Sequence, residues 1–190
     1  MMYKFKVEYY DEQHKSLLKQ YSCYDEIEKL VVNCFTVSEE EFHSYALFRE
    51  QKNYDGWRTY QELKLKIPSR LLSFKEYFSV NNGLLRSRFS HANDREKHLT
   101  EAIGVGAGLA LVSQLYGLTE ADWERIPETN EKDLDFEIAS NGKEYIEVEV
   151  KGAVVQNINI KSEISGRARH IKDKKKKNQK DQMMIFHVLE

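Results

Sequence analysis

Cysteine and proline are scarce in this chain, which has two of each among its 190 residues. Cys23 and Cys34 are too few for a disulfide framework or a cysteine-rich zinc site, and their scarcity favours a reducing compartment. Two prolines and nine glycines exclude the collagen-like and low-complexity classes. Residues 1–8 contain no apolar run of signal-peptide length, so the sequence predicts a cytoplasmic protein.

Long hydrophobic runs are also rare, although 41% of the residues are hydrophobic and suffice for a core. An uncharged run of 18 residues, from Ala102 to Thr119, is close to the length of a membrane span. It contains several glycines together with Ser113 and Gln114, and the mean hydropathy of the chain is -0.67. We therefore predict a buried core helix here and no membrane partner.

Charge is distributed unevenly, although the net charge is only -2. Residues 1–95 are close to neutral, residues 96–150 carry a net -9, and residues 151–190 carry a net +6. Clustered carboxylates can hold a divalent cation, and clustered lysines and arginines can neutralise phosphates. The simpler alternative is a pair of solvated charged faces.

The first half of the chain is predicted to be an N-terminal α+β region, residues 1–93, with no function that its sequence defines. Alternating apolar residues predict a strand near the N-terminus, and apolar stripes predict helices further on. The expected elements are a strand over 1–10 and helices over 25–35, 38–48 and 73–80. Ser38 is the expected start of the second helix, and Asn81-Asn82-Gly83 the expected stop of the third.

The second half, residues 94–190, has a sharper pattern. A helix is predicted from Asp94 to Gly117, because an aspartate can cap its start and a glycine commonly ends a helix. Apolar and charged residues then alternate on both sides of Ser140-Asn141-Gly142, which predicts a hairpin. A helix over 160–178 and a strand over 183–188 follow. This order predicts an α/β or α+β fold, with a mixed sheet covered by helices.

One face of the predicted hairpin is strongly charged. It carries, in chain order, Asp133, Asp135, Glu137, Glu147, Glu149 and Lys151. Like charges packed across a ladder repel, so this face is costly without a counter-ion. A magnesium ion removes that cost, because carboxylate oxygens are the ligands that Mg²⁺ prefers. The ammonium group of Lys151 is then expected beside the ion.

The register of the hairpin decides which carboxylates can meet. A two-residue connection at Asn141-Gly142 places Asp135 and Glu149 on opposite faces. A three-residue connection over residues 140–142 pairs Asp133 with Glu149 and places both aspartates on the face of that glutamate. The sequence leaves open which aspartate is the ligand.

These residues resemble the signature of the PD-(D/E)xK nuclease superfamily, whose core is the restriction endonuclease-like fold. Asp135 followed by Glu149-Val150-Lys151 at the end of an apolar strand is similar to the motif itself. Glu101, in the preceding helix, resembles the acidic residue that this family often places there. The resemblance covers residues 94–188. It implies a restriction endonuclease-like core, and superfamily members commonly continue with another helix or strand, so we expect the native chain to extend beyond residue 190.

The chain departs from the family pattern at two positions. Leu134 stands where the family often has proline. No tyrosine follows Gln156 at the spacing of the RecB-like subfamily, so that subfamily motif is incomplete.

The resemblance implies a metal-dependent endonuclease, with DNA rather than RNA as the expected substrate. Asp135, Glu149 and the main-chain carbonyl of Val150 would hold Mg²⁺, and Lys151 would orient a water and stabilise charge on the phosphate. Glu101 would contact the ion through water or hold a second ion. The nucleic acid backbone would lie along a basic segment that includes Arg167, Arg169, Lys172, Lys174 and Lys175.

Two other functions are compatible with the same residues. The chain could be a catalytically inactive nucleic-acid-binding module on the same fold, or a protein-interaction domain whose charged hairpin is solvated. A homodimer, or association with other domains of a longer chain, is a further expectation for this chain. Zinc chemistry has little support, because the six histidines show no pairing at helical spacing.

Overall fold

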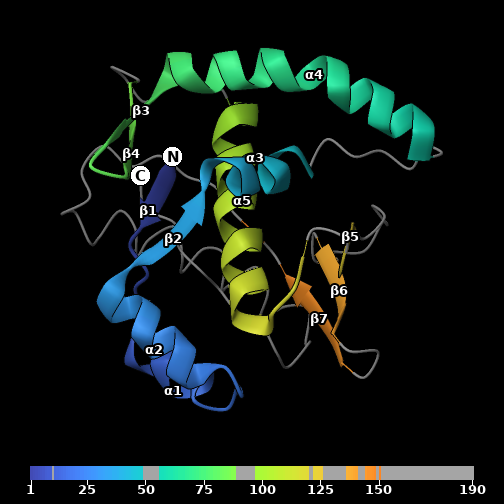
Figure 1. Ribbon diagram of the computed structural model, residues 1–190. Coiled ribbons are helices and arrows are strands. Elements are labelled where there is room, and N and C mark those ends of the chain that lie inside the picture. Colours follow the sequence, from blue (N-terminus) through green and yellow to red (C-terminus); the bar gives the residue numbers. More distant parts are fainter. Residues whose placement is uncertain are drawn as a thin grey trace.

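The computed structural model describes residues 1–9, 11–48, 56–88, 97–119, 122–125, 136–140, 144–148 and 150. These residues form helices and two sheets, which confirms a mixed α+β class (Figure 1). The helices are α1 (Glu12–Leu18), α2 (Tyr24–Asn33), α3 (Glu39–Phe48), α4 (Gly56–Tyr77) and α5 (Lys97–Tyr116). The strands are β1 (Met2–Phe5), β2 (Phe35–Ser38), β3 (Phe78–Asn81), β4 (Leu84–Ser87), β5 (Trp123–Arg125), β6 (Phe136–Ser140) and β7 (Glu144–Val148).

The first sheet has the strand order β2-β1-β4-β3. Its pairs are antiparallel except β1 with β4, which run parallel. Asn82 and Gly83 connect β3 to β4 with φ values of 54° and 80°. Positive φ at both central residues is typical of the type I′ turn, whose twist matches that of a hairpin. The predicted helix over 73–80 is therefore wrong in its last residues, because β3 begins at Phe78.

Two predicted helix boundaries can be compared with the structure directly. The backbone N–H of Glu41 donates to Ser38 Oγ at 3.1 Å, so Ser38 caps the start of α3 as expected. The helix predicted over 25–35 instead ends at Asn33. Cys34 has a φ of 66° and breaks the helix, and Phe35 begins β2.

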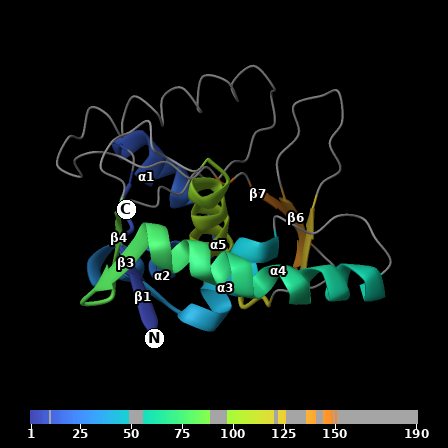
Figure 2. The same ribbon diagram turned by 90° about the horizontal axis from the view of Figure 1, so that it is seen from above.

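Helix α5 lies at the centre of the molecule, between the two sheets (Figures 1 and 2). It ends before Gly117, which adopts the predicted left-handed conformation with a φ of 65°. The segment Leu99–Tyr116 is long and apolar enough to cross a membrane, but 72% of it is buried inside the structure. The prediction of a buried core helix at this place is thus confirmed.

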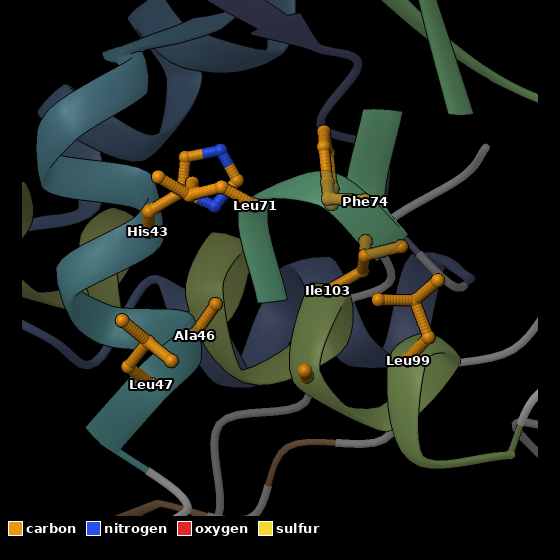
Figure 3. A pocket seen from close by; sticks show the side chains of 8 residues that line it. His43, Ala46, Leu47, Leu71, Phe74, Leu99 and Ile103 are labelled. Atoms are coloured by element: carbon orange, nitrogen blue, oxygen red, sulfur yellow. The ribbon is translucent and has the colours of Figure 1, made fainter. Parts of the chain in front are cut away.

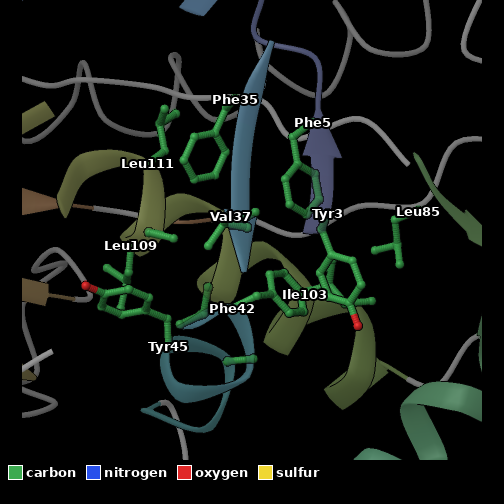
Figure 4. Packing of buried hydrophobic residues seen from close by; sticks show 14 of the residues in the cluster. Tyr3, Phe5, Phe35, Val37, Phe42, Tyr45, Leu85, Ile103, Leu109 and Leu111 are labelled. Atoms are coloured by element: carbon green, nitrogen blue, oxygen red, sulfur yellow. The ribbon is translucent and has the colours of Figure 1, made fainter. Parts of the chain in front are cut away.

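One hydrophobic cluster joins the first sheet, α3, α4, α5 and the second sheet. Aromatic rings fill its centre, and the rings of Phe5 and Phe42 stack with their centroids 5.8 Å apart (Figure 4). Trp123 from β5 and Val148 from β7 reach the same cluster. The helix and strand predicted over 160–178 and 183–188 lie outside the described residues.

Candidate functional site

Two of the predicted site residues can be placed. Glu101 lies on α5, and Val150 follows the end of β7 by two positions. The other predicted site residues lie outside the described part of the chain: Asp133, Asp135, Glu149, Lys151, Arg167, Arg169, Lys172, Lys174 and Lys175.

The register of the β6–β7 hairpin differs from both predicted alternatives. Phe136 pairs with Val148, and Ser140 pairs with Glu144, so the three residues 141–143 connect the strands. The connection has the length of the second alternative but begins one residue later along the chain. The first predicted pairing is therefore wrong by one position on one strand and the second by two, an error that the turn sequence alone does not reveal.

A row of acidic residues crosses the second sheet. Glu124 of β5 pairs with Glu137 of β6, which in turn pairs with Glu147 of β7. Residues opposite one another in a ladder share a face, and like charges in that position destabilise the pairing. Glu137 and Glu147 are predicted from the alternating pattern of the hairpin, whereas Glu124 is not, because a strand of three residues is too short to produce an alternating pattern.

The second sheet is fixed to α5 at two places. The indole Nε1 of Trp123 donates a buried hydrogen bond of 2.9 Å to Ser113 Oγ on α5. At the other place, α5 comes so close to Val150 that a Cβ added to Gly108 would lie 2.8 Å from Val150 Cγ1. The glycine-rich segment of α5 is thus a packing surface, as its small residues predict.

Glu101 lies two turns before Gly108 on α5. Residues seven apart lie on nearly the same face of a helix, and two turns separate them by about 10 Å along the axis. Glu101 is half-buried, and its Oε2 atom is buried. The side of α5 that contacts Val150 therefore also carries Glu101.

Val148 and Val150 both face the interior of the molecule. Val148 is 2% exposed, and the side chain of Val150 lies against α5. Within the described residues, no group of three or more histidine, cysteine, aspartate and glutamate side chains is placed to hold a metal ion.

A second candidate site, which the sequence does not predict, consists of His43 on α3 and the polar and aromatic groups around it. The His43 Nε2 atom lies 3.3 Å from the hydroxyl of Tyr3, and its ring meets that of Phe74 edge to face at 4.7 Å. Burial raises the pKa of Tyr3, and the carboxylates of Glu39 and Glu40 raise it further. Burial also lowers the pKa of His43.

His43 also lines a small pocket, about 30 Å³ in volume (Figure 3). The other lining residues are apolar and come from α3, α4 and α5: Ala46, Leu47, Leu71, Phe74, Leu99, Ala102 and Ile103. A cavity of this volume is large enough to hold a water molecule. No sequence signal marks the position, because Tyr3 and Phe74 are brought to His43 only by the tertiary fold.

Comparisons of the chain with protein-family models, with curated proteins and with solved structures find no match.

Proposed function

We propose that the chain is a magnesium-dependent nuclease that hydrolyses phosphodiester bonds in DNA, with a restriction endonuclease-like core. The observation that carries this proposal is the register of the second sheet. Continued by one pair beyond Phe136 and Val148, it would bring Asp135 directly opposite Glu149. Two carboxylates directly opposite one another on neighbouring strands, next to the acidic row of Glu137 and Glu147, favour a bound cation.

The same register favours one of the two candidate aspartates. Asp135 would pair with Glu149, whereas Asp133 would lie two positions further along the strand. Successive residues on one face of a strand are about 7 Å apart, too far for both aspartates to share an ion with Glu149. We therefore assign Asp135 and Glu149 as the ligands, with the carbonyl of Val150 as a third.

The position of Glu101 sets it apart from these ligands. Val150 faces α5, so alternation would direct the neighbouring Glu149 and Lys151 away from that helix. Glu101 lies on α5 itself, on the side of Val150. The proposal therefore gives Glu101 no direct bond to the ion of Asp135 and Glu149, and its effect on activity should be smaller than theirs.

In the reaction, the side chains of this chain position the phosphate and the attacking water. When bound, magnesium polarises a phosphate oxygen and lowers the pKa of a coordinated water. Lys151 orients that water by hydrogen bonding and stabilises the negative charge that develops on the phosphate. The basic segment, with Arg167, Arg169 and the lysines after them, neutralises neighbouring phosphates of the strand.

Nicking of supercoiled plasmid by the full chain tests this function. We expect nicking with Mg²⁺, none with EDTA, and a loss of about 100-fold or more in Lys151→Ala. Lys19→Ala removes an exposed lysine at the end of α1 and is the matched control, which should keep wild-type activity.

Equal nicking by Lys151→Ala and the wild type would contradict the assigned site. Salt-sensitive DNA binding without cleavage at any Mg²⁺ concentration would instead identify an inactive binding module. Absence of both binding and cleavage would leave an interaction domain as the function.

A further inference from the structure

Among the described side chains of the long helix α4, those that pack against the rest of the molecule lie in its C-terminal part. Figures 1 and 2 show α4 lying across one end of the molecule, over α3 and α5. Among its described side chains only Phe74 is buried, at 5% exposure, while Leu65 and Leu72 are 80% and 70% exposed. Pro68 interrupts the hydrogen bonding within the helix, because proline has no backbone N–H. In the part after Pro68, Phe74 is the buried contact, and Tyr77 at the end of the helix packs partly buried against the same hydrophobic cluster.

His43 lies at the centre of that contact. Its ring meets the ring of Phe74 at 4.7 Å and an angle of 88°, and together with Leu71 the two line the small pocket between α3, α4 and α5 (Figure 3). The aromatic rings of Tyr3 and Phe42 also meet the imidazole edge to face, with centroid distances of 6.0 and 5.3 Å. A neutral imidazole fits these surroundings, whereas a charged one would lose hydration there.

We propose that His43 is an acid-sensitive latch, which holds residues 69–77 of α4 against α3 and α5 and releases them when its imidazole takes up a proton. The pocket beside the ring has room for about one water molecule, so water can reach the imidazole once the contact with Phe74 loosens. This latch does not depend on the nuclease proposal.

The charged groups around His43 shift its pKa in opposite directions. Burial is the largest effect and lowers the pKa of His43, and the ammonium of Lys75 on α4 lowers it further. Glu39 and Glu40 on α3 raise it. Tyr3 on β1 contributes a neutral hydroxyl, and the lining residues of α5 (Leu99, Ala102 and Ile103) carry no charge. Because the closed position disfavours the protonated ring, a fall in pH shifts α4 toward the released position.

Hydrogen–deuterium exchange of the full chain at pH 7.5 and pH 5.0, corrected for intrinsic exchange rates, tests the latch. We expect protection of residues 69–77 to fall by about threefold or more at the lower pH, while the buried segment of α5 keeps its protection. His43→Gln cannot take up the proton and should remove this pH dependence. The matched control His14→Gln, which changes a buried histidine on α1, should retain it.

Two surface variants test the sign of the effect without altering the core. Both side chains, Lys75 and Glu40, are exposed. Lys75→Gln should weaken the release of α4 at low pH, because it removes a positive charge that opposes protonation of His43 in the closed position. Glu40→Gln should strengthen the release, because it removes a negative charge that favours the protonated ring there. The latch is refuted if the wild type keeps its α4 protection at pH 5.0, if His43→Gln loses it equally, or if α5 loses protection together with α4.

Discussion

Gly108 of α5 lies directly against Val150, so that a Cβ at this glycine would be 2.8 Å from Val150 Cγ1. Atoms of real side chains do not approach this closely, and only hydrogen at position 108 leaves room for the valine. The contact seats Val150, two positions after the end of β7, on the central helix.

A methyl group at Gly108 should therefore destabilise the fold. We expect Gly108→Ala to lower the free energy of unfolding by about 1–3 kcal/mol, the usual cost of overpacking, as measured by urea denaturation. In the double variant Gly108→Ala with Val150→Ala, the smaller side chain makes room for the added methyl. The two substitutions should then be less than additive, and strict additivity would show that residues 108 and 150 do not touch.

Gly106 should respond differently, because the nearest of its neighbours is a backbone atom. A Cβ there would lie 2.9 Å from the carbonyl oxygen of Phe42 on α3. Gly106→Ala should also cost about 1–3 kcal/mol in urea denaturation, since α3 and α5 must move apart. Shortening the neighbouring side chain with Phe42→Leu should not recover the loss. A recovery would mean that the ring, and not the carbonyl, limits the approach of the helices.

Cys34 carries backbone strain between α2 and β2. Its φ of 66° and ψ of 158° lie in a region that only glycine adopts without cost. Cys34→Gly should raise the free energy of unfolding by about 1 kcal/mol, because relief of strain exceeds the added entropy of the unfolded chain. Cys34→Ala keeps the Cβ atom and should bring no such gain. Equal stability of the two variants would contradict this account.

The stability of the fold should depend on pH through His43. The folded pKa of this histidine lies below its ordinary value of 6.5, so the unfolded chain binds the proton more tightly. The free energy of unfolding should therefore rise with pH up to about 6.5 and then level off. His43→Gln should flatten this part of the profile in urea denaturation from pH 5 to 8. A slope of unchanged size would assign the dependence to other groups.

The sequence predicted the elements whose signals are local. Ser38 identifies the start of α3 through its own hydroxyl, and Gly117 identifies the end of α5 through its left-handed backbone. The long uncharged stretch of α5 predicted a core helix, which the structure confirms. Each of these signals acts within a few residues of its position, so no tertiary contact is needed to interpret it.

Features that depend on pairing were predicted less well. The helix predicted over 73–80 extends past Phe78, whereas in the structure Phe78 is the first residue of β3. Asn82-Gly83 is a strong hairpin signal that favours this strand. The predicted register of β6 and β7 differs from the observed one, because the position of a three-residue connection depends on which strand residues contact the core. The surroundings of His43 involve four separate elements and have no signal in the sequence.

Plasmid nicking by a matched pair of aspartate variants tests the central claim most directly. Asp135→Asn and Asp133→Asn make the same chemical change two residues apart, and the register of β6 and β7, continued by one pair, would place only position 135 opposite Glu149. We expect Asp135→Asn to lose about 100-fold or more of the Mg²⁺-dependent nicking rate, while Asp133→Asn stays within a few-fold of the wild type. Wild-type nicking by Asp135→Asn, or loss of activity only in Asp133→Asn, would contradict the account.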